Sequence, residues 1–319
     1  MRTGSSELEE KNLKKAVLGI MVSALLFGTM EVALKIGGSK LDSMQMTFLR
    51  FFIGGLVLAP FAVPETRERM RAMEKSSGYA TRRVTWRDAL PPRDLLWLLL
   101  VGFTGVSFSM LFFQLGVERC NASTSAPLMS TNPLFTMIIA HLFTSEKMNK
   151  LKGMAFFVGL AAIFFLMRPW DVQEGNSVPG IIFMLIAAIT FGAYTVMGRR
   201  TVGRIGLFTQ TSISFFFGSL ILLIGMLITG RPVIAGILDN WLVVLYVGVM
   251  ITGVGYLFYF IGIRYSDATT GSMTFFIKPV IAPILAMLIL HETILWNTIV
   301  GIILLIAASS LTLLAARKS

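Results

Sequence analysis

Apolar stretches alternate with polar segments along almost the whole chain, and ten of them approach or reach the length of a membrane span. A helix that rises about 1.5 Å per residue needs about 20 mostly apolar residues to cross about 30 Å of hydrocarbon. The ten stretches are residues 16–36, 43–63, 95–117, 122–143, 153–168, 178–198, 207–229, 240–262, 268–290 and 297–315. The pattern predicts an all-α membrane protein with ten transmembrane helices.

Composition supports a lipid environment. The 319 residues are 55% hydrophobic and 14% charged, and the mean hydropathy is +0.75. Soluble chains carry about 25% charged residues, so the lipid bilayer is predicted to cover most of the surface of this one. The net charge of +11 is typical of the cytoplasmic loops of a membrane protein, and no nucleic-acid partner is expected.

The lysines and arginines divide unevenly between the two sides when the N-terminus is placed in the cytoplasm. The outer side then keeps few of them: Lys35, Lys40, Arg119, Arg168 and Arg231. This asymmetry predicts a multi-pass protein of the cell (plasma or inner) membrane with both termini in the cytoplasm. Residues 1–15 are predicted to form a cytoplasmic tail, and residues 64–94 a cytoplasmic loop.

The two halves of the chain repeat each other. Leu115 to Glu146 align without a gap on Ile261 to Glu292, and an earlier segment aligns as well. The matched pairs are Gly116 and Gly262, Ala122 and Ala268, Pro133 and Pro279, Glu146 and Glu292, Phe27 and Phe191, Gly28 and Gly192, Lys35 and Arg199, and Phe51 and Phe215. Five helices per half make this an inverted repeat, predicted at residues 16–168 and 178–315. Inverted repeats are typical of secondary transporters, in which rocking of the halves exposes a central site alternately to each side.

Several motifs resemble those of one transporter family. They are Leu26-Phe27-Gly28 with Lys35, Leu49-Arg50-Phe51, and the Pro-x12-Glu pairs Pro133/Glu146 and Pro279/Glu292. Together they resemble the drug/metabolite transporter (DMT) superfamily, specifically its ten-helix EamA-type branch, over all of the chain except the N-terminal tail and residues 64–94. The resemblance implies a transporter of amino acids, other metabolites or small solutes, without specifying the substrate.

Lys278 lies near the middle of the ninth predicted helix, directly before Pro279. A charge at the bilayer centre costs about 2.5 to 3.5 kcal/mol on insertion scales, so it is expected to face a cavity or a partner. Lys278 is predicted to bind a substrate anion; the alternative is a permanent pair with a carboxylate. Asn132 is its repeat equivalent, and the two side chains are expected to hold a carboxylate together.

Glu31 and Arg50 lie at similar depth in the first and second predicted helices. Their repeat equivalents, Thr195 and Ser214, are both uncharged, which favours a structural ion pair between Glu31 and Arg50. Glu31 is equally compatible with a role in binding substrate or a proton.

Further polar and aromatic side chains are candidates for the substrate site, as hydrogen-bond donors or aromatic walls, with plain packing as the alternative. They are Gln114, Tyr194, Tyr256, Tyr259 and Phe275. Glu146 and Glu292 follow the fourth and ninth predicted helices, and each is expected to cap the helix after it.

The sequence lacks the motifs of an ATP-driven pump and of an enzyme. It contains no phosphate-binding G-x-x-x-x-G-K-[ST] motif, so a gradient or an exchanged solute is expected to supply the energy. A single cysteine, two separated histidines and the lack of an intramembrane aspartate pair argue against an enzyme, a metal site and a cofactor.

The leading prediction is a secondary transporter that exports amino acids or other carboxylate-bearing or zwitterionic metabolites. The alternative is an organic-cation/proton antiporter that uses Glu31. Protons or a counter-substrate are the expected coupling partners, and a monomer or weak dimer is the expected assembly.

Overall fold

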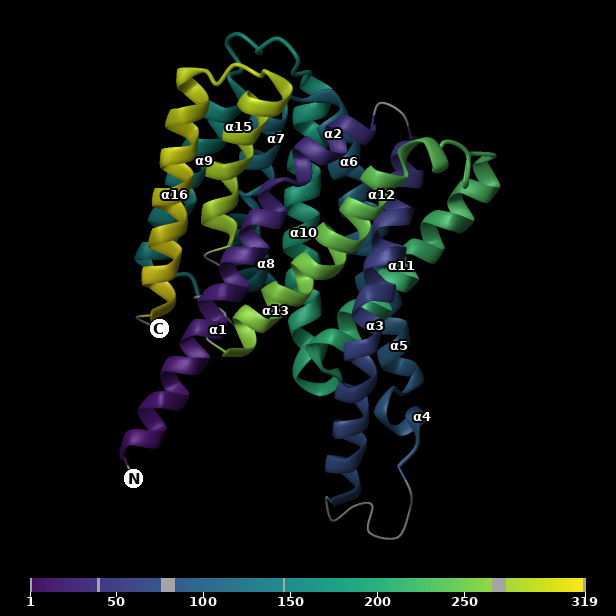
Figure 1. The fold of residues 1–319 in the computed structure, drawn as a ribbon. Helices are drawn as coiled ribbons and strands as arrows, with labels where there is room; N and C mark the ends of the chain where they lie inside the picture. Colours follow the sequence, from purple (N-terminus) through teal and green to yellow (C-terminus); the bar gives the residue numbers. More distant parts are fainter. Residues whose placement is uncertain (1, 39–40, 76–83, 146, 266–273, 318–319) are drawn as a thin grey trace.

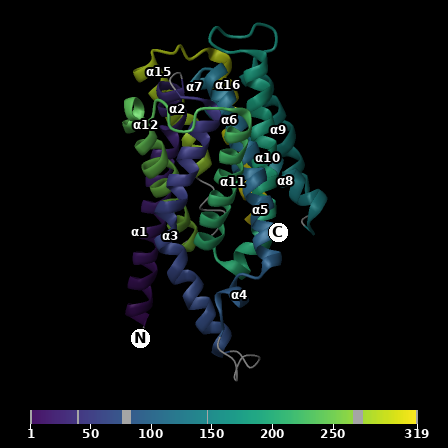
Figure 2. The same cartoon turned by 90° about the vertical axis from the view of Figure 1, so that its right-hand side faces the viewer.

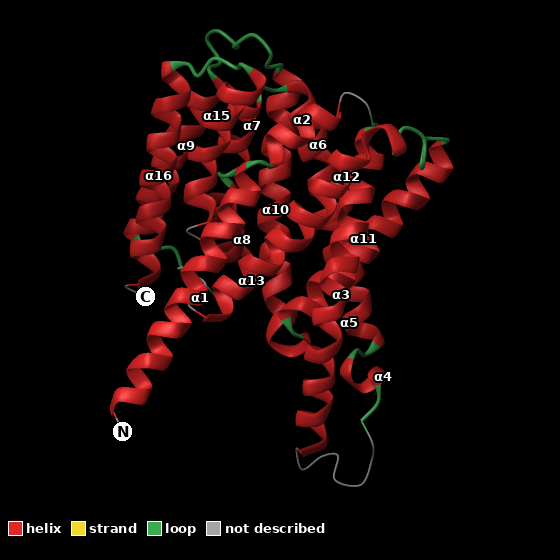
Figure 3. Ribbon diagram, viewed as in Figure 1, coloured by secondary structure: helices red, strands yellow, loops and turns green. Residues whose placement is uncertain are grey.

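The computed structural model describes residues 2–38, 41–75, 84–145, 147–265 and 274–317. At residues 2–11, 38, 263–264, 274–276 and 316–317 it describes the backbone alone. Throughout this described part the secondary structure consists of helices joined by loops (Figure 3).

The first half of the chain contains five crossings of the helix bundle. They are α1 (Arg2–Gly28) with α2 (Met30–Gly38); α3 (Ser43–Lys75); α5 (Pro92–Gly102) with the π-helix η1 (Phe103–Ser109) and α6 (Met110–Arg119); α7 (Ala122–Met129) with α8 (Asn132–Phe143); and α9 (Lys150–Met167). A short helix, α4 (Trp86–Ala89), precedes α5.

The second half repeats this order. Its crossings are α10 (Val178–Ile205); α11 (Leu207–Thr229); η2 (Leu238–Asn240) and α12 (Trp241–Leu245) with the π-helix η3 (Tyr246–Gly255) and α13 (Tyr256–Tyr265); α15 (Thr274–Leu290); and α16 (Trp296–Arg317). Eight of the described helical spans are long and apolar enough to cross a membrane, α15 adds a shorter apolar helix, and α7 with α8 forms a broken one. The predicted ten-helix membrane fold is confirmed.

The packing of the helices has the symmetry of an inverted repeat. The first-half helix α1 packs against α13 and α15 of the second half, and the second-half helix α10 packs against α6 and α8 of the first half. The helices α3 and α11 pack against each other, as do α9 and α16. Phe51 of α3 and its repeat equivalent Phe215 of α11 meet edge to face with ring centroids 4.8 Å apart. The pseudo-twofold axis therefore passes between α3 and α11.

Both termini lie at the same end of the bundle, which is the end where α3 and α4 protrude (Figures 1 and 2). Two predicted irregular segments at this end are partly helical. Within the predicted tail, residues 1–15, the part from Arg2 onward forms the beginning of α1. The first part of the predicted loop, residues 64–94, forms the last turns of α3, which ends at Lys75. The run Glu65 to Lys75 consists mainly of strong helix formers with Glu and Arg at helical spacing, which favours this extension.

Candidate functional site

A buried ion pair joins the first and ninth crossings. The ammonium Nζ of Lys278 lies 2.6 Å from Oε1 of Glu31, and the two side chains are 5% and 0% exposed. An isolated charge in this environment is costly, whereas a close pair neutralises both groups. The sequence left two roles open for Lys278, a ligand of a substrate anion or a partner of a carboxylate. In the structure it is paired with a carboxylate.

Close packing of α1 against α15 places Glu31 in this position. The α1 helix ends at Gly28, Thr29 has turn geometry, and α2 starts at Met30. A Cβ atom on Gly28 would lie 2.7 Å from Cγ2 of Ile281, so only glycine lets α1 approach α15 this closely. The close approach brings Glu31 within reach of Lys278, less than one turn from Ile281 along α15.

Arg50 is not the ion-pair partner of Glu31, which corrects the sequence-based prediction. Its Nη1 donates to Sδ of Met30 at 3.7 Å, and its guanidinium lies over the rings of Phe51 and Phe113, 4.8 and 5.4 Å from their centroids. The arginine is 1% exposed and still interacts electrostatically with Glu31. Lys278 pairs with the carboxylate of Glu31 instead, because α15 packs against both α1 and α2.

Phe113 of α6 was not predicted, yet both cations lie over its ring. Nζ of Lys278 is 5.6 Å from the centroid of this ring, so both Lys278 and Arg50 make cation–π contacts with it. The repeat offers the signal that could have found it, because Phe113 aligns with Tyr259, a predicted site residue. Glu31, Arg50, Phe113 and Lys278 are called the central charge cluster below.

The central charge cluster keeps unused hydrogen-bonding capacity. Among the described residues, Nε and Nη2 of Arg50 and Oε2 of Glu31 have no hydrogen-bond partner. Buried polar groups in folded proteins are nearly always paired. These donor and acceptor atoms are therefore candidates for hydrogen bonds to a polar ligand or to water. The cluster can therefore offer two cationic donors and one carboxylate acceptor within a short distance.

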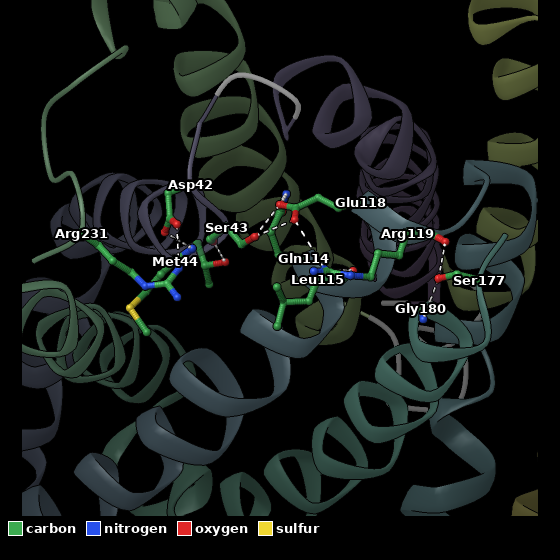
Figure 4. Close-up of polar contacts among 11 residues, drawn as sticks. Asp42, Ser43, Met44, Gln114, Leu115, Glu118, Arg119, Ser177, Gly180 and Arg231 are labelled. Atoms are coloured by element: carbon green, nitrogen blue, oxygen red, sulfur yellow. Dashed lines mark hydrogen bonds and ion pairs between the residues drawn. The ribbon is translucent and has the colours of Figure 1, made fainter. Parts of the chain in front are cut away.

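Gln114 belongs to a polar network between α3 and α6 (Figure 4). Its Nε2 donates to Oε1 of Glu118 at 3.3 Å, and Oγ of Ser43 lies 2.7 Å from both oxygens of that carboxylate. Gln114 is fully buried, and its own Oε1 has no hydrogen-bond partner among the described residues. The network fixes α3 to α6 and was not predicted.

Asn132 begins α8 directly after the break in the fourth crossing, and its Nδ2 donates to the carbonyl oxygen of Met129 at 3.1 Å. It is buried at 5% exposure. The described contacts of Asn132 are therefore local, and do not include Lys278. The side chain of Phe275 lies outside the described residues.

The three predicted tyrosines lie in aromatic packing beside the pseudo-twofold axis. The ring of Tyr256 meets those of Phe27 and Phe215, each with centroids 5.2 Å apart. Tyr259 also contacts Phe27, and Tyr194 interacts electrostatically with Tyr256 and Tyr259. The tyrosines are thus near one another, and Tyr256 also interacts electrostatically with Arg50 of the central charge cluster.

Glu292 caps a different helix from the one expected. Its Oε1 accepts from the backbone N–H of Ala122 at 2.8 Å, and its Oε2 accepts from the N–H and hydroxyl of Ser123 at 2.9 and 2.7 Å. These groups start α7, whereas the following helix is α16. Glu146 lies outside the described residues.

A second carboxylate caps a helix at the opposite end of the bundle. Oε1 of Glu65 accepts from the N–H of Leu207 at 3.0 Å, and its Oε2 accepts from the N–H of Thr209 at 2.8 Å, at the start of α11. A carboxylate at a helix N-terminus is stabilised by the unpaired N–H groups and the helix dipole. Glu65 and Glu292 therefore each tie one half of the repeat to the other.

Ten crossings in two inverted halves, with buried charges between them, define a multi-pass membrane transporter. The family model described as "EamA-like transporter family" matches residues 14–168 and 178–314, so the chain belongs to this family. The predicted membership of the DMT superfamily is confirmed.

Three relatives carry transporter names. An "uncharacterized transporter" of Clostridium kluyveri is 34% identical over 96% of each chain. The "uncharacterized transporter YoaV" of Bacillus subtilis is 24% identical over 91% of this chain and 94% of its own. An "S-adenosylmethionine uptake transporter" of Rickettsia bellii is 24% identical over 66% of this chain and 63% of its own.

The fold also has a counterpart among solved structures. A crystal structure with 17% sequence identity superposes with a TM-score of 0.65 and covers 96% of this chain and 97% of the other. This likeness concerns the fold alone.

Proposed function

We propose that this protein is a secondary transporter of amino acids or other carboxylate-bearing or zwitterionic metabolites, with no enzymatic activity, and that it acts as an exporter. The observation that carries the proposal is the buried pair of Glu31 and Lys278, 2.6 Å apart. A zwitterion has the same two charges as this pair, so it is able to replace each partner with one of its own groups.

The proposed binding step is an exchange of ion pairs. The substrate carboxylate takes the ammonium of Lys278 and the unused N–H donors of Arg50, while the substrate ammonium takes the carboxylate of Glu31. Charge-assisted hydrogen bonds are among the strongest available in a buried site, and the exchange leaves no charge unpaired. Asn132, Gln114, Tyr194, Tyr256, Tyr259 and Phe275 are proposed as further lining residues.

Alternating access is proposed to follow from rocking of residues 16–168 against residues 178–315. The contacts that would have to change in such a motion include the carboxylate caps of Glu292 on α7 and of Glu65 on α11, because each of them joins the two halves. Protons or a counter-substrate are proposed to drive the cycle.

The name of the Rickettsia bellii relative is compatible with this substrate class. S-adenosylmethionine carries an amino-acid ammonium and carboxylate, together with a sulfonium cation. A site with one carboxylate, two cationic side chains and an aromatic ring offers a partner to each of these groups.

The second candidate is an organic-cation/proton antiporter. It is favoured by the placement of Glu31, which is completely buried in a region rich in aromatic rings. In this hypothesis the carboxylate of Glu31 binds a proton and an organic cation in turn, and Lys278 serves only to keep the carboxylate ionised.

The substrate is tested by a thermal-shift screen of the purified protein against amino acids, organic anions and organic cations, since a ligand that binds only the folded state raises its apparent stability. We expect a zwitterion to give the largest shift. In Lys278→Met its affinity should fall at least about tenfold, equivalent to about 1.4 kcal/mol. Lys278→Arg should restore binding in part, because a guanidinium presents its donors in a different geometry.

Glu31→Gln/Lys278→Met is the control, because it removes both charges together and is expected to stay folded without binding zwitterions. Unchanged zwitterion binding by Lys278→Met would rule out the carboxylate site. Organic-cation shifts that need Glu31 and not Lys278 would support the antiporter instead.

We also propose that the protein resides in the cell (plasma or inner) membrane as a monomer or weak dimer, with both termini in the cytoplasm. Two exposed residues at opposite ends of the bundle, Arg87 and Glu174, allow a direct test. In a Cys120→Ser background, an impermeant thiol reagent applied to intact cells should label Glu174→Cys and not Arg87→Cys. Labelling of Arg87→Cys alone would reverse the orientation.

A further inference from the structure

A cavity opens between α5, α10 and α11, away from the central charge cluster. It has a volume of about 620 Å³ and combines basic and apolar lining residues. The basic residues are Arg93, Arg200 and Arg204, and the apolar ones include Leu96, Leu100, Phe103 and Ile221. The basic residues lie on α5 and α10 near the same end of the bundle as the termini.

The arginines at the mouth of the cavity outnumber the acidic groups. Arg204 pairs with Asp94, the one acidic residue of the lining. Arg93 and Arg200 are exposed, and among the described residues no carboxylate forms a salt bridge with either of them. The mouth therefore has a surplus of two positive charges, which complements an anion.

Trp97 holds one of these arginines in position. The guanidinium of Arg200 lies 5.0 Å from the centroid of the Trp97 ring, and Nε1 of Trp97 donates to the carbonyl oxygen of Met197 at 3.2 Å. The indole is thereby anchored to α10, and the cation–π contact orients the guanidinium. Tryptophan is also favoured at the membrane interface, where lipid headgroups lie.

Beyond these arginines, the lining of the cavity is mainly apolar and exposed. Leu96, Leu100 and Phe103 lie at positions i, i+4 and i+7, so they form one stripe, and all three are exposed. From Arg93 to Phe103 the helix rises about 15 Å, about half of the hydrocarbon thickness. The stripe covers about 10 Å of this rise, which lies within the depth of one leaflet and suits part of an acyl chain.

We infer that this cavity is a binding site for one anionic phospholipid. Its phosphate is held by Arg93 and Arg200, and an acyl chain lies along Leu96, Leu100 and Phe103. Basic pockets between transmembrane helices are a recurring way to recognise anionic headgroups. A soluble phosphate ester fits the arginines equally well, but it would leave the apolar stripe uncovered, so the lipid is the occupant that uses both parts of the cavity.

The test is native mass spectrometry of the delipidated protein in detergent, titrated with phosphatidylglycerol or with phosphatidylcholine of the same acyl chains. The wild-type protein should bind one phosphatidylglycerol more tightly than phosphatidylcholine. Arg93→Gln/Arg200→Gln should weaken phosphatidylglycerol binding about twenty-five-fold, because each arginine near the surface contributes about fivefold.

The matched control is Arg67→Gln/Arg71→Gln, which removes the same charge from exposed positions of α3 at the same end. It should change the affinity less than about twofold. Leu100→Trp fills the groove without altering charge, and should weaken the binding of both lipids. Equal affinity for the two lipids, an equal loss in the control, or full binding by both cavity variants would overturn the proposal. Displacement of the lipid by an equal concentration of glycerol 3-phosphate would assign the cavity to soluble phosphate esters instead.

Discussion

Gly28 of α1 packs directly against Ile281 of α15, and a Cβ on this glycine would lie 2.7 Å from Cγ2 of the isoleucine. The same relationship recurs in the other half. Gly192, the repeat equivalent of Gly28, would place a Cβ 2.9 Å from the backbone nitrogen of Thr136 and 3.1 Å from the carbonyl carbon of Phe135. Since Phe135 is the repeat equivalent of Ile281, the two glycine contacts are related by the inverted repeat.

Gly28→Leu should therefore separate α1 from α15. Overpacking of a close contact costs about 1 to 3 kcal/mol, and the shift should also lengthen the contact between Glu31 and Lys278. We expect a lower thermal unfolding temperature in detergent together with weaker substrate binding. Gly203→Leu is the control, because nothing lies within 4 Å of a Cβ at that position. Wild-type stability and binding in Gly28→Leu would show that the close approach is not required.

Removal of one member of the buried ion pair should be more damaging than removal of both. Glu31→Gln leaves the Lys278 ammonium buried without its carboxylate, and breaking such a pair costs about 3 to 5 kcal/mol. Glu31→Gln/Lys278→Met should regain much of this stability. The measurement is a double-mutant cycle of thermal stability, which isolates the coupling between the two positions.

The same cycle with Arg50 identifies the true partner of Glu31. Because Arg50 contacts Met30, Phe51 and Phe113 rather than the carboxylate, Glu31→Gln/Arg50→Gln should recover less stability than the variant that combines Glu31→Gln with Lys278→Met. A larger recovery with Arg50→Gln would mean that Glu31 pairs with Arg50 in the membrane.

Glu292→Gln should loosen the start of α7. The substitution keeps the size of the side chain but removes its charge, and therefore the charge-assisted bonds to the N–H groups of Ala122 and Ser123. Hydrogen exchange of peptides that cover the start of α7 should become faster, by about tenfold for a loss of about 1.4 kcal/mol. Glu174→Gln, on an exposed loop, is the control and should exchange like the wild type. Unchanged exchange in Glu292→Gln would show that the carboxylate cap does not stabilise the start of α7.

Cys120 should resist alkylation in the folded protein. It lies between α6 and α7 and is fully buried, and burial raises the pKa of its thiol to about 11. The thiolate, which is the reactive form, is therefore scarce at pH 8. Alkylation should become fast only when the protein unfolds, because the folded thiol is both protonated and inaccessible. An exposed cysteine, as in Cys120→Ser/Glu174→Cys, should react readily at pH 8.

The same pKa makes stability depend on pH. An unfolded cysteine has a pKa of about 8.5, below the folded value of about 11. The unfolded state then loses its proton first, so the free energy of unfolding should fall as the pH rises from about 8.5 to about 11. This fall should be absent in Cys120→Ser. Equal pH profiles for the two proteins would show that the folded thiol titrates normally.

The ten crossings and their division into two repeats could be predicted from the sequence alone, because both depend on local patterns. A window of about 20 apolar residues predicts a span wherever it occurs, and the pairing of Pro133 with Pro279 needs no knowledge of which helices touch. Sequence also identified Glu31, Arg50 and Lys278 as the unusual residues, because a charge within an apolar span is costly in any arrangement.

Which of those residues contact one another depends on the packing of helices that are distant in the sequence. Glu31 meets Lys278 rather than Arg50 because α15, far away in the sequence, packs against α1 and α2. Phe113 enters the cluster, and Glu292 caps α7, for the same reason. Hydropathy describes how each helix faces lipid, but it does not specify which helix lies beside which; that is set by close contacts such as the one between Gly28 and Ile281.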